Sequence, residues 1–275
     1  MAKVGVVIDS GVSLPDELLD EYGIEVVPLV TVFGDKLYRD RLDLKTPAEL
    51  FQLIKKSNTF PTTSAPSPTD YLEKFKRLSQ KVDSILYVAM SSKLSVSFSS
   101  ATMAKEMAGN ELPDVKIEVF DSMTTVGAAG KSLAQVVKTA EAVRSKVTMI
   151  FIMDTLSYLA KSGRIGRAQA LMGNMLSIKP IVEIPPSSGR VEPVTRVRTK
   201  PKALKQLLEI VEQRVGTEKP VHMMVERTAV PGEAAELKEM VAGRFNCAEV
   251  LLCEFNPTGA VTIGPGNLGL SFYCD

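Results

Sequence analysis

The chain has 275 residues, of which 45% are hydrophobic and 24% are charged, and its formal net charge is +1. This length suits one large domain or two modest ones, and the composition is that of a globular protein without long disordered tracts. A net charge so close to zero provides no overall field that would attract nucleic acid. The longest later apolar run, residues 147–153, is too short to cross a bilayer. We therefore expect neither nucleic-acid binding nor stable insertion into a membrane.

Histidine and cysteine usage excludes further classes of function. His222 is the only histidine, so a histidine-rich metal site cannot form within one chain. The cysteines, Cys247, Cys253 and Cys274, form no C-x-x-C motif, which argues against a disulfide framework or a zinc knuckle. The first apolar run is too short for a signal peptide, because Asp9 interrupts it. We therefore expect a cytoplasmic protein with neither a metal nor another cofactor.

In the first half of the chain, short apolar runs alternate with amphipathic segments of helical length. This alternation predicts an α/β fold with a mostly parallel sheet and right-handed crossovers. Ser13, Thr46 and Ser67 are each followed three residues later by an acid, which predicts a capped helix start at each position. The expected strands are residues 4–8, 24–33, 85–90 and 115–120. The expected helices begin after Ser13 and then cover residues 49–56, 71–78, 99–108 and 128–143.

The second half has a different pattern, with more strands that resemble antiparallel or mixed pairs. The expected strands are residues 147–153, 181–184, 191–197, 221–225 and 250–255, with a last strand after the turn at residues 264–269. The expected helices are residues 158–161, 167–177, 202–214 and 233–242. We place a boundary near residue 148, so that residues 1–148 form an N-terminal α/β lobe and residues 149–275 a C-terminal α/β lobe.

Pairs of small polar residues follow three of the expected parallel strands. The pairs are Asp9 and Ser10, Ser91 and Ser92, and Asp121 and Ser122. The carboxyl ends of parallel strands meet at one edge of the sheet, where open α/β sheets bind their ligands. Hydroxyl groups and free backbone N–H groups at that edge suit an anion. Capping of the following helix explains any single pair equally well, but three pairs at one edge favour a binding site.

Two further segments carry polar groups suited to a ligand. Residues 61–68 contain three prolines and four hydroxyl residues. This composition predicts a stiff loop that presents its hydroxyls at little cost in entropy, with a solvated turn as the alternative. Arg164, which lies between Gly163 and Gly166, is positioned to pair either with a ligand carboxylate or with Asp154.

Motifs for nucleotide binding and for ester hydrolysis are missing from the sequence. Residues 264–269 match G-x-G-x-x-G, but Pro265 lies inside the motif and six residues follow it, so no dinucleotide-binding helix can come next. The sequence contains neither a G-x-x-x-x-G-K-[ST] phosphate loop nor a G-x-S-x-G nucleophile elbow.

Eight short motifs, spread over essentially the whole chain, resemble those of the DegV family of bacterial proteins and occur in the same order. Each motif alone is weak, whereas eight in register are specific. The motifs are Val7-Ile8-Asp9-Ser10, residues 61–68, Ser91-Ser92-Lys93-Leu94-Ser95, Asp121-Ser122, Lys161-Ser162-Gly163-Arg164-Ile165, Lys179-Pro180-Ile181, Val197-Arg198-Thr199 and Gly264-Pro265-Gly266.

The resemblance implies a two-lobed α/β fold, in which a Rossmann-like lobe with a parallel sheet precedes an α/β lobe with a mixed sheet. It also implies that a long-chain fatty acid such as palmitate lies in the cleft between the lobes, and that the protein catalyses no reaction by itself. Characterised relatives present the acyl group to a separate fatty acid kinase, which phosphorylates the carboxylate. A fatty acid kinase is therefore the partner that the resemblance implies.

The same resemblance implies which residues bind the ligand. The Thr-Ser loop and the Ser-Ser segment hold the carboxylate, and Arg164 matters in the partnership with the kinase. Many relatives have a histidine near the carboxylate where this chain has Thr262, a residue that still donates a hydrogen bond. The expected ligand-binding residues are thus Thr62, Thr63, Ser92, Ser95, Arg164 and Thr262.

Two other functions remain open. A serine hydrolase or acyltransferase would use Ser92 as its nucleophile, with His222, Lys93 or a carboxylate as the base. A binding protein for another small anion, such as a phosphorylated metabolite, is disfavoured by the missing phosphate loop and by the modest number of basic residues near the expected crevice.

Overall fold

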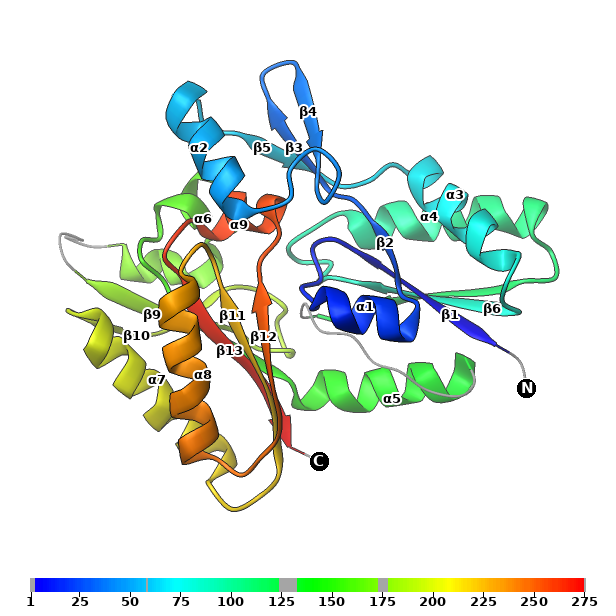
Figure 1. The fold of residues 1–275 in the computed structure, drawn as a ribbon. Helices are drawn as coiled ribbons and strands as arrows, with labels where there is room; N and C mark the ends of the chain where they lie inside the picture. Colours follow the sequence, from blue (N-terminus) through cyan, green and yellow to red (C-terminus); the bar gives the residue numbers. More distant parts are fainter. Residues whose placement is uncertain (1–2, 58, 124–132, 173–177, 275) are drawn as a thin grey trace.

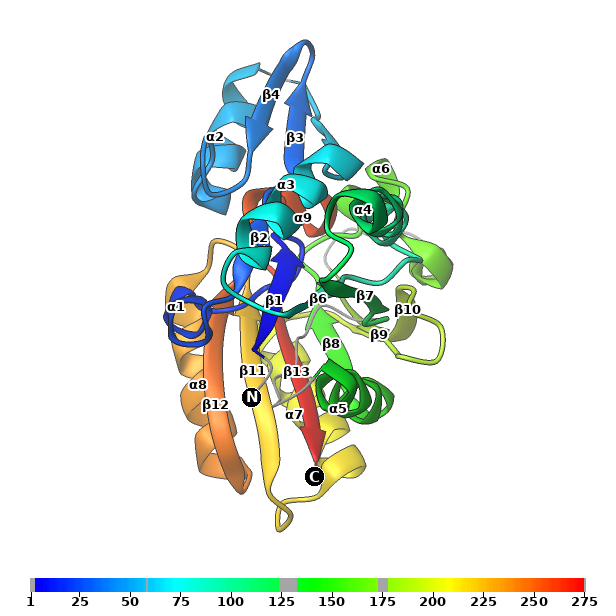
Figure 2. The same ribbon diagram turned by 90° about the vertical axis from the view of Figure 1, so that its right-hand side faces the viewer.

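The computed structural model describes residues 3–57, 59–123, 133–172 and 178–274, and their strands form three sheets. Two α/β lobes lie side by side (Figure 1), and a small three-stranded sheet stands above their junction. Figure 2 shows the same small sheet at the top of the molecule, far from both termini. Among the described residues, no helix is long and apolar enough to cross a bilayer.

The first lobe is built on a four-stranded parallel sheet with the strand order β2-β1-β6-β7. Its strands are β1 (Val4–Asp9), β2 (Glu25–Val27), β6 (Ser84–Ala89) and β7 (Lys116–Asp121). Helices α3 (Pro68–Ser79) and α4 (Ser97–Glu111) cover one face, and α1 (Asp16–Tyr22) and α5 (Leu133–Lys146) cover the other. Every residue of β6 is buried, as expected for a central strand with helices on both faces.

The second lobe is built on a six-stranded mixed sheet with the order β10-β9-β8-β13-β11-β12, in which only β11 and β12 are parallel neighbours. Its strands are β8 (Thr148–Ile152), β9 (Lys179–Ile184), β10 (Glu192–Val197), β11 (Val221–Arg227), β12 (Cys247–Glu254) and β13 (Leu268–Cys274). Helices α7 (Lys200–Val215) and α8 (Pro231–Arg244) bury one face. The other face packs on α6 (Ser157–Lys161) and on residues of the first lobe, including Leu94 and Val143.

The small sheet and the remaining helices connect the two lobes. The sheet contains β3 (Val30–Phe33), β4 (Lys36–Arg39) and β5 (Thr62–Ser64), and the helices are α2 (Pro47–Ser57), α6 (Ser157–Lys161), the 3-10 turn at Gly166–Leu171 and α9 (Pro257–Ile263). Leu44 and Leu50 pack against Ala260 and Val261, so α2 lies on α9 of the second lobe. The first half of the chain therefore extends over the second lobe, and α5 contacts both β6 and β13. The lobe boundary at residue 148 stays a prediction.

The structure confirms the parallel-sheet and mixed-sheet lobes but corrects two of the expected elements in the first half of the chain. Residues 24–33 are not one strand: Pro28 and Leu29 separate β2 in the parallel sheet from β3 in the small sheet. Proline has no backbone N–H to donate to a strand neighbour, so the chain changes sheet there. The predicted stiff loop at residues 61–68 contains β5, whose Thr63 pairs with Thr31 of β3.

Helix starts follow the predicted caps in two of three cases. Ser67 and Asp70 form a capping box at α3, and Thr46 Oγ1 accepts a hydrogen bond from Glu49 N at 3.3 Å. Ser13 caps nothing, because its buried hydroxyl has no hydrogen-bond partner within the described chain. The predicted helix at residues 167–177 is a 3-10 turn as far as Leu171, and its residues 173–177 lie outside the described chain. Residues 128–132, the start of the helix predicted at residues 128–143, also lie outside it.

A buried carboxylate, Asp40, joins three parts of the fold. Its Oδ2 accepts a hydrogen bond from Ser10 Oγ, at the end of β1, at 2.8 Å. Its Oδ1 accepts from Thr258 N at 3.0 Å and from Thr258 Oγ1 at 2.8 Å, at the first turn of α9. Asp40 itself follows β4 of the small sheet, and its N–H donates to Leu29 O. The first lobe, the small sheet and the second lobe are therefore linked through one side chain.

We expect Asp40→Ala to lower the free energy of unfolding by about 3 kcal/mol, because a buried donor left without an acceptor costs ~1–3 kcal/mol. Urea denaturation followed by circular dichroism measures the change. Asp35→Ala, which removes the same group from an exposed turn, serves as the control and should change stability by less than about 0.5 kcal/mol. Equal stability of Asp40→Ala and the wild type would contradict the linking role.

Candidate functional site

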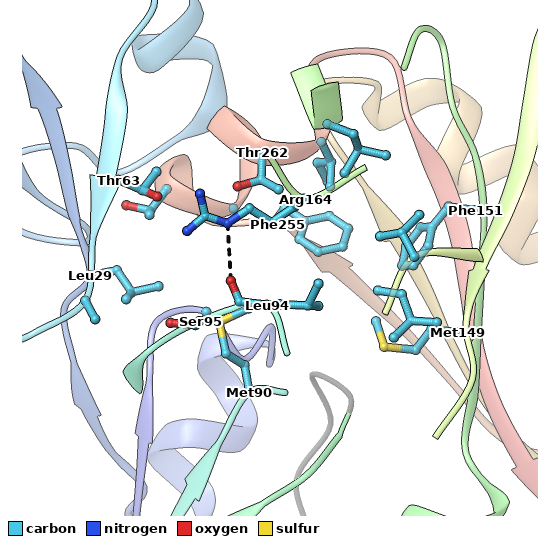
Figure 3. Close-up of a pocket in the computed structure, with 18 of the residues that line it drawn as sticks. Leu29, Thr63, Met90, Leu94, Ser95, Met149, Phe151, Arg164, Phe255 and Thr262 are labelled. Carbon is cyan, nitrogen blue, oxygen red and sulfur yellow. Dashed lines mark hydrogen bonds between the residues drawn. The ribbon is translucent and has the colours of Figure 1, made fainter. Parts of the chain in front are cut away.

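A cavity of about 250 Å³ lies where the two lobes and the small sheet meet (Figure 3). Segments far apart in the sequence form its wall: the end of the first lobe's sheet at Gly11 and Met90, β5, the mixed sheet and α9. The site therefore lies beyond the carboxyl ends of the parallel strands, where open α/β sheets bind ligands.

One end of the cavity is apolar. Met149 and Phe151 of β8 and Val182 and Ile184 of β9 project from the inner face of the mixed sheet and line this end. Phe255 closes the side, with its ring centroid 5.7 Å from that of Phe151. Aliphatic, thioether and aromatic groups of this kind offer a hydrocarbon favourable contact and offer a charged group none.

The other end of the cavity is polar. Figure 3 shows Thr63, Ser95, Arg164 and Thr262 on the side away from Met149 and Phe151, where Leu29 and Met90 also lie. These four residues come from β5, from the turn before α4, from the loop after α6 and from α9. The structure thus brings four of the six predicted ligand-binding residues to one wall. The hydroxyls of Thr63 and Thr262 bond to no other described residue, so both are available to a ligand.

Ser95 is held in place by the start of α4. Its Oγ accepts a hydrogen bond from Ser97 N at 3.1 Å and lies 2.9 Å from Ser97 Oγ. When Ser97 is the donor of the second bond, the hydroxyl proton of Ser95 is free to face the cavity. The next residue, Val96, also lines the cavity and is 66% exposed, so the polar end reaches the surface there.

Arg164 is the only charged residue among the described residues of the wall. Its Nε donates to Leu94 O at 3.3 Å and its Nη1 to Ser162 O at 2.5 Å. These two bonds orient the guanidinium and leave Nη2 without a partner among the described residues, at the polar end of the cavity. The predicted alternative of an Arg164–Asp154 pair is wrong, because Asp154 bonds to Lys179.

Thr62 and Ser92, the other two predicted residues, do not line the cavity. Thr62 is exposed at the start of β5, and strand alternation directs it away from its neighbour Thr63. Ser92 lies at the turn after β6, where its N–H donates to Asp121 Oδ1 at 3.2 Å. Because neither side chain lines the cavity, a substitution at Thr62 or Ser92 can serve as a control for substitutions in the cavity wall.

The polar pairs at the ends of the parallel strands stabilise turns rather than line the cavity. Ser91 Oγ donates to Gly189 O of the second lobe at 2.8 Å, and Ser10 Oγ accepts from Leu29 N. Asp9 accepts from Tyr87 and from Gly11 N, and burial raises its pKa above the usual range. The prediction located the correct edge of the sheet but not the residues that line the site.

Sequence reasoning missed α9, which contributes Thr258, Gly259 and Thr262 to the wall. The helix begins after Asn256, whose side chain accepts from Gly259 N at 2.8 Å, with Pro257 in the first turn. Asparagine followed by proline is a recognisable helix start. That signal was therefore available in the sequence.

A nucleophilic role for Ser92 with His222 as the base has no geometric support. His222 Nδ1 lies 2.8 Å from Glu249, and its ring stacks on Tyr273. It lies near the start of β11 and is not among the residues that line the cavity. Among the described residues, no group of three or more histidine, cysteine or acidic side chains could hold a metal ion.

Two buried acids lie close to the cavity. Burial raises the pKa of Asp40 to about 7, although its bonds with Ser10 and Thr258 act in the opposite direction. Burial likewise raises the pKa of Glu226 to about 7, and only Ser271 opposes the shift. Ser271 Oγ donates to Glu226 Oε2 at 2.5 Å, and Oε1 has no partner within the described chain. Glu226 lies on the inner face of the mixed sheet, beside Gly269.

The chain is similar over its whole length to known proteins. The model of the DegV family, which is described as uncharacterised, matches residues 3–275. A DegV domain-containing protein of Streptomyces coelicolor is 32% identical, with 97% of each chain covered. A solved DegV family protein of Thermus thermophilus, described by its fatty acid binding, is 29% identical, with a TM-score of 0.88 and all of both chains covered. DegV of Bacillus subtilis, described as a fatty acid binding protein, is 25% identical, with a TM-score of 0.86 and the same coverage.

We expect Glu226→Gln to remove part of the pH dependence of stability. The folded protein holds the proton of Glu226 more tightly than the unfolded chain does, because burial raises this pKa from 4.5 to about 7. The contribution of protonated Glu226 to the free energy of unfolding is therefore fully present below pH 4.5 and is lost as the pH rises through about 7. Relative to that of the wild type, the free energy of unfolding of Glu226→Gln should rise by about 3 kcal/mol between pH 5 and pH 8. The figure follows from the conversion of ~1.36 kcal/mol per pKa unit.

Urea denaturation at both pH values measures this gain. Glu236→Gln, an exposed position on α8, is the control and should follow the wild type at each pH. A gain of the same size in the control, or none in Glu226→Gln, would contradict the assignment.

Proposed function

The chain belongs to the DegV family, and we propose on this basis that it binds one long-chain fatty acid in the cavity between its lobes. The observation that carries the proposal is the division of the cavity wall into a polar and an apolar end. A fatty acid has the same division, with a carboxylate at one end and a hydrocarbon chain at the other. The two solved relatives described as fatty acid binding support the same ligand class.

In the proposed complex, the tail lies against Met149, Phe151 and Ile184 and supplies most of the affinity. Burial of a methylene group contributes ~0.8 kcal/mol, so a palmitate tail gains about 12 kcal/mol before the losses of ordering and association. An unpaired carboxylate would cancel much of this gain, because burial of a charge without hydrogen-bond donors is costly. The polar end of the cavity therefore has to offset the cost of burying the head.

We assign the head to Thr63, Ser95, Arg164 and Thr262. Two threonine hydroxyls are free, and the guanidinium has an unused Nη2 beside them. A carboxylate has about four acceptor positions, so it can bond to several of these donors at once. Thr62 and Ser92 lie outside the wall, and we give them no direct contact with the carboxylate.

The protein so described is a carrier rather than an enzyme. His222, one candidate base for Ser92, bonds to Glu249 and stacks on Tyr273, and the polar end of the cavity reaches the surface at Val96. A carboxylate held there lies near solvent while its tail is buried. This arrangement suits presentation of the carboxylate to a second protein that modifies it, and we propose a fatty acid kinase as that partner.

The first test is the ligand itself. We expect native mass spectrometry of gently purified protein to show one bound molecule with the mass of a long-chain fatty acid, and delipidated protein to bind palmitate in a one-to-one ratio. Delipidated protein that binds neither saturated nor unsaturated long-chain acids would contradict the proposed function.

The second test concerns the head. Thr63→Val with Thr262→Val keeps the shape of both side chains but removes two free donors, and a hydrogen bond to a charged group contributes ~1.5–3 kcal/mol. We expect palmitate affinity to fall by at least about tenfold, as measured by displacement of a fluorescent fatty acid. Thr62→Val makes the same change at the adjacent exposed position and should leave affinity unchanged. Equal affinity in the double variant and the wild type would overturn the head assignment.

A further inference from the structure

Gly269 lies beneath the apolar end of the cavity without lining it. It occupies the second position of β13, opposite Phe151 of β8 and opposite Glu226 of β11. Its backbone has the extended conformation of a strand, which any residue can adopt, so the turn after α9 does not require glycine at this position. Glycine inside a strand instead often marks a place where another group approaches the backbone closely.

The group that approaches Gly269 is the ring of Phe151. A Cβ atom on residue 269 would lie 2.0 Å from Phe151 Cδ1 and 2.3 Å from Phe151 Cε1, which is far inside van der Waals contact. The nearest backbone atom, Ile150 O, would lie 3.0 Å away, so the strand itself would need only a small adjustment. Directly paired residues of antiparallel strands project from the same face of the sheet. The ring of Phe151 can therefore lie against β13 because residue 269 has no side chain.

The surroundings of Phe151 determine where the ring would go if it were displaced. Met149 and Met153 flank it along β8 on the same face, and the ring of Phe255 lies beside it. Gly269 is its partner on β13 and Val182 its partner on β9, and both Phe151 and Val182 line the cavity. The ring is 6% exposed. A methyl group on residue 269 would thus push the ring away from β13, toward Val182 and into the part of the cavity that both residues line.

We infer that Gly269 sets the length of acyl chain that the protein accepts, by allowing Phe151 to lie against the sheet and leave the apolar end of the cavity open. This inference rests on the proposed function, because it concerns the tail of the ligand bound there. Gly269 acts as a specificity-determining residue through Phe151 and does not touch the ligand. Its role is separate from head binding, which involves the opposite end of the cavity.

The test compares the affinities of saturated fatty acids from about 12 to about 18 carbons for the delipidated wild type and for Gly269→Ala, by displacement of a fluorescent fatty acid. Each methylene that can no longer be buried weakens binding about fourfold. We expect the affinity for the longest acid, relative to an acid about four carbons shorter, to fall at least about tenfold in Gly269→Ala. Binding of the shortest acids should change little, because their tails end before the ring.

Two further variants make the result specific. Gly269→Ala combined with Phe151→Leu replaces the ring with a smaller group and should restore the preference of the wild type. Gly243→Ala adds the same methyl group on α8, where it meets no atom within 4 Å, and should leave the preference unchanged. If Gly269→Ala fails to fold, Phe151→Leu alone still tests the inference, because it should shift the preference toward longer acids.

The outcomes separate the inference from the function on which it rests. A wild type that binds no long-chain acid contradicts the proposed function. A wild type that binds such acids, together with a folded Gly269→Ala of unchanged preference, overturns the role of Gly269 and leaves the function intact. A shifted preference that Phe151→Leu does not restore would also overturn the role, because the shift would then arise elsewhere.

Discussion

The arrangement of this molecule depends on hydrogen bonds to one buried carboxylate. Asp40 accepts from Ser10 at the end of the first lobe's sheet and from Thr258 at the start of α9. The same helix carries Thr262, and the strand that pairs with β3 carries Thr63, so both threonines are positioned by elements attached to Asp40. A cavity formed between separate sheets keeps its shape only if the sheets are fixed relative to one another, and this carboxylate contributes directly to that fixation.

The two ends of the cavity differ in the source of their rigidity. The apolar end rests on the mixed sheet, whose strands hold Met149, Phe151 and Ile184 in register. The polar end is assembled from a short strand, two turns and a short helix, and hydrogen bonds fix its side chains there. A sheet provides a rigid apolar surface, which is all that contact with a hydrocarbon requires. Separate loops suit a carboxylate, which needs donors from several directions.

Features that depend on neighbouring residues were predictable from the sequence. The capping box at Ser67 and the buried strand β6 follow from local patterns, and the motif order led to the two-lobed fold. The position of the site at the edge of the parallel sheet was also predictable, because it depends on the topology of such sheets. Contacts between distant residues were not, because no local pattern encodes them. The bond between Asp40 and Thr258 spans 218 residues, and it holds the first turn of α9, whose Thr258 lines the cavity.

The same limit explains why the predicted polar pairs were structural. Ser10 and Ser91 stand at the correct edge, but partners elsewhere in the chain, Asp40 and Gly189, already use their hydroxyls. Arg164 was assigned two alternatives because its neighbours in the sequence do not reveal that Asp154 bonds to Lys179. Local sequence identifies groups that can bind a ligand, whereas the tertiary structure determines which of them remain free to do so.

The strand order of the mixed sheet has a consequence for biosynthesis. β13 is made from residues 268–274, later than every other strand, yet it lies in the middle of the sheet between β8 and β11. Until the ribosome releases this segment, β8 and β11 each expose an unpaired edge, and Phe151 lacks the strand against which its ring packs. The nascent chain can complete its first sheet early, since domains fold in the order of their synthesis. The cavity, in contrast, cannot be completed before residues 268–274 have emerged, because β13 is the strand that joins β8 to β11.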